Sequence, residues 1–268
     1  MSSRTTLSLI AAALACAFAA SAADKPAATQ RNFVSCPIVR DTATVPCWLA
    51  EYDGELYYLG IQTDVSADFH PPFLGHRVLV EGTLKDMPRI CGGLVLEPVK
   101  VSPLAELDGT CNTILPAEDR YTVPFAPRPP GPSGGRLAFD AAPSSTPRAA
   151  PPPLEGPQDF VLYYDFDMLV GGRHSAVLSR IVNYVNTLGA AQIAITAYRG
   201  ATLLSDGTLL VEREDLPPLR AREVAKLLEG AGLPPGAMQV GASSELSAAD
   251  GDGDWQARRT VVRVEPRN

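Results

Sequence analysis

The spacing of apolar residues after residue 159 predicts strands that alternate with helices. Residues 160–166 and 192–196 have the length and apolar pattern of strands. Between them, apolar side chains recur every three or four residues, as on one face of a helix that Ser175 can cap and Gly189 can end. This order predicts an α/β sandwich, in which helices pack on one face of a sheet.

The same pattern continues to the end of the chain. A second helix is predicted to begin at Pro217 and to end at Gly230, and residues 237–240 and 260–265 are predicted to supply the later strands. Between Gly200 and the second helix, an Asp-Gly pair separates two apolar runs. This insertion is therefore predicted to form a hairpin.

The first half of the chain has strand patterns instead. Apolar runs at residues 47–52, 55–61, 76–82 and 93–101 are rich in β-branched and aromatic residues, and an Asp-Gly turn joins the first two. A small all-β domain is predicted, OB-like in its meander order, although an open sandwich has nearly the same pattern. The chain as a whole is therefore predicted to be α+β.

Four aromatic residues of this first domain allow two interpretations. Trp48, Tyr52, Tyr57 and Tyr58 have the residue types of a platform on which OB barrels hold sugars or bases. Aromatic residues in strands more commonly pack in a half-buried surface. The sequence favours packing.

The first 23 residues have the features of a secretory signal. Arg4 precedes an apolar run that is too short to cross a membrane, and Ala20-Ser21-Ala22 offers a cleavage site. The expected location is the periplasm, with no membrane span in the mature chain. An alternative uses Cys16 as a lipid-attachment cysteine, which would anchor the protein to a membrane.

A proline-rich segment separates the two ordered regions. Residues 124–157 alternate proline with glycine, serine, alanine and arginine, a composition that cannot bury apolar surface and favours extended polyproline II. We predict a linker that keeps apart a disulfide-bonded domain at residues 32–118 and a second domain at residues 159–266. A proline-rich ligand is the alternative.

The mature chain has four cysteines, all in the first domain. An even number in an exported chain predicts two disulfides. Because short loops close most easily, Cys36 with Cys47 and Cys91 with Cys111 is the favoured pairing of three. Zinc is the alternative, but no Cys-x-x-Cys spacing is present, so no metal site is predicted.

Charge and motif content exclude several function classes. The net charge is −7, with lysine and arginine scattered, which indicates no nucleic-acid partner. No serine has a Gly-x-Ser-x-Gly setting, and no pair of carboxylates is spaced for acid and base work. We therefore expect no catalytic residue, no cofactor and no enzymatic activity.

Two segments of the second domain resemble the OmpA-like domain, a periplasmic module that holds peptidoglycan. They are residues 216–224, which contain Arg220, and residues 257–264, which begin with Ala257 followed by Arg258 and Arg259. The resemblance covers residues 159–266. It implies that Arg220 takes a carboxylate of diaminopimelate in the wall peptide, and that Arg258, Arg259 and Tyr198 are further ligand residues.

The sequence departs from the family pattern at one ligand position. The family's aspartate would fall within residues 197–200, which contain no carboxylate. Four acids of the insertion are candidates to meet an ammonium instead: Asp206, Glu212, Glu214 and Asp215. If Arg220 has no external ligand, its expected partners are Glu223 or Asp215.

Two functions follow from the sequence. The first is a non-enzymatic cell-envelope protein that binds peptidoglycan through its OmpA-like domain and an envelope protein through its N-terminal domain. The alternative is a degenerate OmpA-like domain that serves as a structural or protein-interaction module in a periplasmic assembly, without wall binding. Arg220 with a nearby carboxylate in a cleft would favour the first, and Arg220 paired to an internal acid, with the cleft closed, would favour the second.

Overall fold

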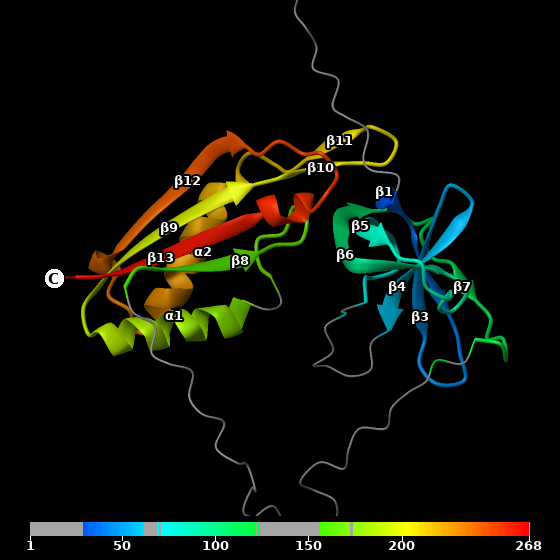
Figure 1. The fold of residues 1–268 in the computed structure, drawn as a ribbon, viewed down its shortest axis with the longest axis horizontal. Coiled ribbons are helices and arrows are strands. Elements are labelled where there is room, and N and C mark those ends of the chain that lie inside the picture. Colours follow the sequence, from blue (N-terminus) through cyan, green and yellow to red (C-terminus); the bar gives the residue numbers. More distant parts are fainter. Residues whose placement is uncertain are drawn as a thin grey trace, which may run out of the picture.

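A computed structural model describes residues 29–61, 69, 71–121, 123, 156–171 and 174–267 of the 268-residue chain. The predictions for the signal peptide, for Cys16 and for linker residues 124–155 lie outside the described residues. The described part consists of two lobes, an N-terminal β lobe and a C-terminal lobe with two α-helices (Figure 1).

The N-terminal lobe is a sheet that closes on itself. Its strands are β1 (Gln30–Ser35), β2 (Pro37–Arg40), β3 (Cys47–Tyr52), β4 (Glu55–Ile61), β5 (His76–Leu84), β6 (Leu94–Leu107) and β7 (Ile114–Leu115), in the order β1-β5-β6-β4-β3-β2-β7. Only Cys36 separates β1 from β2, while β1 pairs with β5 and β2 with β3. One bent stretch therefore pairs with β5 on one side and with β3 on the other, and this curves the sheet into a barrel.

The predicted hairpin in this lobe is confirmed. β3 and β4 are antiparallel, and Asp53 and Gly54 between them both have positive φ, as a tight hairpin turn requires. The prediction missed β1 and β2, whose residues precede the first predicted strand. These two strands close the barrel.

The barrel core contains aromatic residues of β1, β3 and β4. Phe33 stacks on Tyr52 and tilts against Tyr57, with ring centroids 4.8 and 5.1 Å apart. Tyr57 is 3% exposed. Tyr57 therefore packs in the core and is not part of an open aromatic platform, in agreement with the favoured interpretation.

Two disulfides are present, but their pairing differs from the favoured one. Cys36 is bonded to Cys111 and Cys47 to Cys91, across 75 and 44 residues of sequence. The short-loop argument failed because of strand register. Arg40 lies opposite Cys47 in the β2–β3 ladder, so Cys36 and Cys47 lie toward opposite ends of that ladder.

The C-terminal lobe is an α/β sandwich. Its elements are β8 (Gln158–Tyr163), α1 (His174–Leu188), β9 (Ala191–Arg199), β10 (Ala201–Leu203), β11 (Leu209–Val211), α2 (Leu216–Gly230), η1 (Pro235–Ala237), β12 (Met238–Leu246), η2 (Asp254–Ala257) and β13 (Arg259–Pro266). The main sheet has the order β12-β9-β13-β8. Both predicted helices and the predicted β10–β11 hairpin are confirmed within a few residues.

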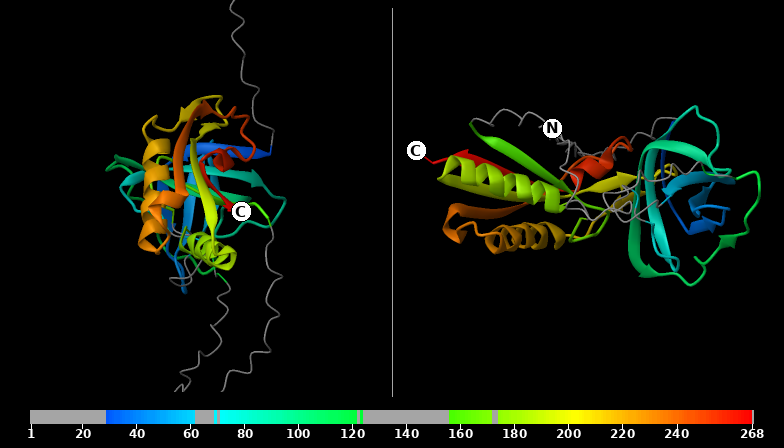
Figure 2. Two further views of the ribbon diagram at one scale, coloured as in Figure 1. Left: turned by 90° about the vertical axis from the view of Figure 1, so that its left-hand side faces the viewer. Right: turned by 90° about the horizontal axis from the view of Figure 1, so that it is seen from below.

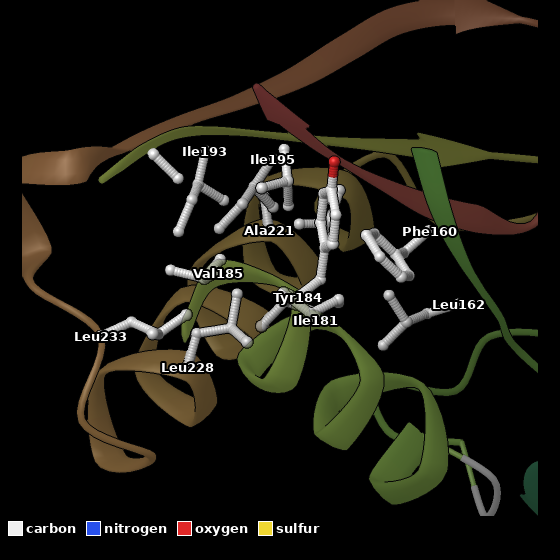
Figure 3. Close-up of a cluster of buried hydrophobic side chains, with 14 of the residues drawn as sticks. Phe160, Leu162, Ile181, Tyr184, Val185, Ile193, Ile195, Ala221, Leu228 and Leu233 are labelled. Atoms are coloured by element: carbon white, nitrogen blue, oxygen red, sulfur yellow. The ribbon is translucent and has the colours of Figure 1, made fainter. Parts of the chain in front are cut away.

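The core of this lobe lies between the sheet and its two helices. Figure 3 shows Ile181 and Tyr184 of α1 and Leu228 of α2 pointing toward Ile193 and Ile195 of β9. These residues belong to one buried cluster that also receives side chains from β8 and β13. Burying each large aliphatic side chain stabilises the fold by about 1.5–3 kcal/mol relative to leaving it exposed.

The two lobes are in contact, rather than held apart as the linker composition predicted. The β10–β11 hairpin and η2 extend from the end of the C-terminal sheet toward β1, β5 and β6 of the barrel (Figures 1 and 2). Leu79 of β5 and Leu204 of the hairpin share a buried apolar cluster. The prediction failed because it considered the linker alone and not the outer face of the barrel.

Among the residues that the structure describes, no helix is long and apolar enough to cross a bilayer.

Candidate functional site

Arg220 lies on α2 and is completely buried. Its Nη1 and Nη2 donate to the two carboxylate oxygens of Glu212, at 3.0 and 2.6 Å. Nε and Nη2 also donate to the carbonyl oxygen of Met168, and Nη1 donates to that of Tyr198 at 3.4 Å. An arginine has five N–H donors. Every one of them on Arg220 therefore has an acceptor within the protein.

Glu212 is positioned by backbone groups on both sides. It follows β11 directly, and its side chain has no exposed surface. Its Oε1 accepts the N–H of Asp167 at 3.0 Å, and its Oε2 accepts the N–H of Gly200 at 2.9 Å. A buried carboxylate with this many donors is well compensated for the loss of water. Glu212 therefore supplies the carboxylate that the family resemblance assigns to an external ligand.

Aromatic rings surround the Arg220 side chain. Its guanidinium carbon lies 4.2 Å from the centre of the Tyr164 ring, and the His174 ring meets Tyr164 edge-on at 4.6 Å. Burial, and to a smaller extent the charge of Arg220, lower the pKa of His174. His174 Nε2 lies 2.9 Å from the carbonyl oxygen of Tyr163, and Nδ1 accepts the N–H of Gly171. These contacts suit a neutral imidazole that donates from Nε2.

Gly200, in the segment where the family's aspartate would fall, has no room for a side chain. A Cβ at this position would lie 2.7 Å from Cγ of Arg258 and 3.2 Å from Cβ of Ala257. Only a residue without a side chain allows Arg258 to pass this close to the backbone. A carboxylate side chain at residue 200 would therefore require Arg258 to move.

Arg258 is buried as deeply as Arg220, but its acid comes from the other lobe. Its Nη1 donates to Oε1 of Glu81 at 3.1 Å, and its Nη2 forms a short bond with Oε2 of the same residue. Nη1 also donates to the hydroxyl of Thr202 at 2.9 Å, and Nε donates to the carbonyl oxygen of Tyr164 at 3.4 Å. Glu81 and Arg258 are 2% and 1% exposed.

The remaining two predicted ligand residues lie together at the surface. The guanidinium of Arg259 lies 4.9 Å from the centre of the Tyr198 ring, and its Nη1 donates to the carbonyl oxygen of Gln256. Both side chains are partly exposed. A ligand role for Arg259 and Tyr198 stays a prediction.

The predicted partners of Arg220 were wrong. Asp215 pairs with Arg213 at 3.5 Å, and both side chains are mostly exposed. Of the insertion acids, Glu214 is 88% exposed and lies near Arg199, whereas Glu212 is buried against Arg220. The prediction considered acids next to Arg220 in the sequence, but the bonds are made by Glu212, which follows the end of β11.

Glu81 was missed by the sequence analysis, although the sequence contains a clue. In β5, Val78 and Val80 point into the barrel core, so the strand alternation places Leu79 and Glu81 on the outer face. The structure shows that the C-terminal lobe covers this face, where Glu81 accepts from Arg258. Leu79 is indeed 0% exposed.

The sequence matches no protein-family model and no curated protein. Solved structures similar to part of it include a MotB-like protein from Desulfovibrio vulgaris, at 14% identity over 42% of this chain and 77% of that one, with a TM-score of 0.34. The peptidoglycan-associated lipoprotein from Burkholderia pseudomallei is 21% identical over 39% of this chain and 89% of that one, with a TM-score of 0.31.

A third similar structure is the OmpA-like domain of FopA1 from Francisella tularensis. It is 12% identical over 41% of this chain and 73% of that one, with a TM-score of 0.32. Each of these three structures covers between 39% and 42% of this chain.

Proposed function

We propose that this is a non-enzymatic cell-envelope protein whose C-terminal domain is a structural or protein-interaction module that does not hold the wall peptide through Arg220. The observation that carries this proposal is the bidentate pair of Arg220 with Glu212, both of whose side chains are 0% exposed. The family resemblance gives Arg220 a ligand role because its guanidinium would be free to bind a carboxylate through two N–H groups. In this protein the carboxylate of Glu212 already accepts from both Nη atoms.

The free-energy cost of separating Arg220 from Glu212 favours the ion pair over binding of an external carboxylate. For a wall carboxylate to bind, Glu212 would have to leave Arg220 and also give up the N–H groups of Asp167 and Gly200. Removing one partner from a buried ion pair typically costs about 3–5 kcal/mol. An external carboxylate would have to recover that cost in addition to its own loss of entropy, so competition from the tethered Glu212 prevents binding.

The cellular setting rests on the sequence. Residues 1–23 have the form of a secretory signal, which would bring the chain to the periplasm. Two disulfides in the N-terminal lobe suit that oxidising compartment. An anchor at Cys16 remains the alternative for attachment to a membrane.

The N-terminal lobe is proposed to be an OB-like barrel that binds an envelope protein. The closed order of its strands supports the OB-like assignment: β4 pairs with β6 in parallel, whereas β1 with β5, β3 with β4 and β5 with β6 are antiparallel. Such barrels commonly serve as binding modules.

Co-sedimentation with insoluble peptidoglycan tests the proposal. The mature protein is mixed with purified wall that contains diaminopimelate, and an OmpA-like domain that has both the family's arginine and its aspartate serves as the positive control. We expect the protein to stay in the supernatant to the same extent with and without wall. Sedimentation with the wall would contradict the proposal.

Variants identify the residues responsible if sedimentation occurs. Loss of sedimentation in Arg259→Ala and Tyr198→Ala would assign wall binding to the exposed pair. Retention in both would place binding elsewhere, and the degenerate-module function would be wrong in either case.

A further inference from the structure

The outer face of the barrel meets the C-terminal lobe through a buried polar network. Glu81 accepts from Arg258 through both carboxylate oxygens, and Oε1 also accepts the hydroxyl of Thr202 at 2.9 Å. Asn32 on β1 donates from Nδ2 to the carbonyl oxygens of Leu203, at 3.0 Å, and Gly251, at 2.8 Å. Asn32 is 1% exposed, so these bonds are made away from water.

The backbones of the two lobes also bond directly. The N–H of Ser205, in the turn of the β10–β11 hairpin, donates to the carbonyl oxygen of Asn32 at 2.7 Å. In return, the N–H of Asn32 donates to the hydroxyl of Ser205 at 3.0 Å. The hairpin tip therefore has a fixed register against β1.

Apolar side chains surround this network. Leu79, Phe166 and Leu204 form one buried cluster, against which partly buried side chains of both lobes pack: Val34, Leu104 and Leu210. At the other side of the interface, the ammonium of Lys100 lies 4.4 Å from the centre of the Trp255 ring. Apolar burial, a buried ion pair and a cation–π contact are thus combined in one interface, as in specific protein–protein interfaces.

The acidic segment 250–254 belongs to the same interface. Within it, Asp254 Oδ2 accepts the N–H groups of Leu203 and Gly251, at 2.8 and 3.1 Å. Asp250 Oδ1 accepts the N–H of Asp252. These carboxylates hold the loop that presents the carbonyl oxygen of Gly251 to Asn32.

We infer that the N-terminal barrel is a built-in ligand of the C-terminal domain. The carboxylate of Glu81 occupies Arg258, one of the three arginines that the family resemblance assigns to ligand binding, and the barrel covers that edge of the domain. The two lobes are therefore one obligate unit, and residues 124–155 are the tether that makes docking intramolecular. This inference concerns Arg258 and stands independently of whether the wall is bound.

Each contribution has its own role in docking. The apolar cluster supplies most of the attraction, because burial of apolar surface is the main driving force of association. The Glu81–Arg258 pair has to lose its water on docking, so its main effect is on specificity and register. A tether raises the effective concentration of the second lobe to about the millimolar range, which adds to the affinity of the interface itself.

The test cuts the tether in the full-length protein. A specific protease site is placed within residues 124–155, the folded protein is cleaved, and the two fragments are separated by size-exclusion chromatography at low micromolar concentration. We expect the fragments to elute together, because the interface holds without the tether. Separate elution of two folded fragments would overturn the inference.

Matched variants test whether the Glu81–Arg258 ion pair is needed for the two fragments to associate. Glu81→Lys places two cations together and is expected to separate the cleaved fragments, and the milder Glu81→Gln is expected to weaken association by about 30-fold or more. Glu55→Gln is the control, since Glu55 belongs to the same lobe but pairs with Arg89 at the surface. It should leave co-elution unchanged.

A folding check accompanies each variant. Because Glu81 lies on the outer face of the barrel, its replacement should leave the barrel core intact. Two observations on the separated fragment check this: intact disulfides and an unchanged far-ultraviolet circular dichroism spectrum. Co-elution of the Glu81→Lys fragments at wild-type strength would overturn the role of the ion pair.

Discussion

The two buried arginines of the C-terminal lobe have the same chemistry but meet acids of different origin. Arg220 pairs with Glu212 from the neighbouring hairpin, 8 residues earlier in the sequence, and Arg258 pairs with Glu81 from the other lobe, 177 residues earlier. The first pair closes a site within one domain. The second joins two domains, so the same kind of bond stabilises a fold in one place and an assembly in the other.

The difference also appears in how each arginine is satisfied. All five N–H groups of Arg220 have protein acceptors, and two of these acceptors are backbone carbonyl oxygens, those of Met168 and Tyr198. Arg258 relies more on side chains, those of Glu81 and Thr202. Changes at Glu212 should therefore affect the folding of one lobe, and changes at Glu81 should affect the contact between lobes.

The largest expected effect is that of Glu212→Ala. It leaves Arg220 charged and buried without its partner, so we expect the free energy of unfolding of the C-terminal lobe to fall by about 3–5 kcal/mol. Urea denaturation followed by circular dichroism measures the loss. The double variant Glu212→Leu with Arg220→Met, which removes both charges, should lose less than Glu212→Ala, and an equal or larger loss would contradict this account.

Rescue by a small carboxylate sharpens the same prediction. The Glu212→Ala variant has space for a carboxylate beside Arg220, so acetate should raise its melting temperature in a concentration-dependent way by mass action. Chloride at equal ionic strength is the control for screening. Wild-type protein should show no acetate-specific shift, since Glu212 already fills the site.

A smaller effect is expected for Gly200→Ala. The added Cβ would lie 2.7 Å from Cγ of Arg258, and overpacking of this kind costs about 1–3 kcal/mol. The matched control is Gly230→Ala at the end of α2, where an added Cβ meets nothing within 4 Å. Urea denaturation of both variants should show destabilisation in the first alone.

His174 predicts a pH dependence near the Arg220 site. Its folded-state pKa is lowered by burial from the ordinary value of 6.5, so the unfolded chain binds the proton more tightly. The contribution of His174 to stability should therefore decrease as the pH falls from 6.5 toward the lowered pKa. Above pH 6.5 this contribution should be constant. The slope of unfolding free energy between pH 5 and 7 should decrease in His174→Gln.

The smallest effect is expected for an ion pair of the same type at the surface. Arg89 and Glu55 lie 2.7 Å apart, but their side chains are 46% and 48% exposed. Glu55→Gln should change the free energy of unfolding by no more than about 0.2–1 kcal/mol. A loss as large as that of Glu212→Ala would show that burial does not set the difference between the pairs.

Much of the secondary structure could be predicted because it depends on local patterns. Apolar spacing located α1 and α2, and Asp-Gly pairs located the hairpins β3–β4 and β10–β11. β1 was missed because its run is short and polar, with Asn32 facing the other lobe instead of solvent. A strand whose polar residue is buried in an interface lacks the alternation that identifies strands.

The sequence by itself determined which residues carry charge, that Arg220 and Arg258 lie in family-like segments, and that four cysteines are available in one lobe. Only the tertiary structure decided which partners they meet. Cys36 bonds Cys111, and Arg258 meets Glu81, because strand register and the docking of the barrel bring together groups that are far apart in the sequence. Such contacts depend on the whole fold, and for this reason local patterns do not specify them.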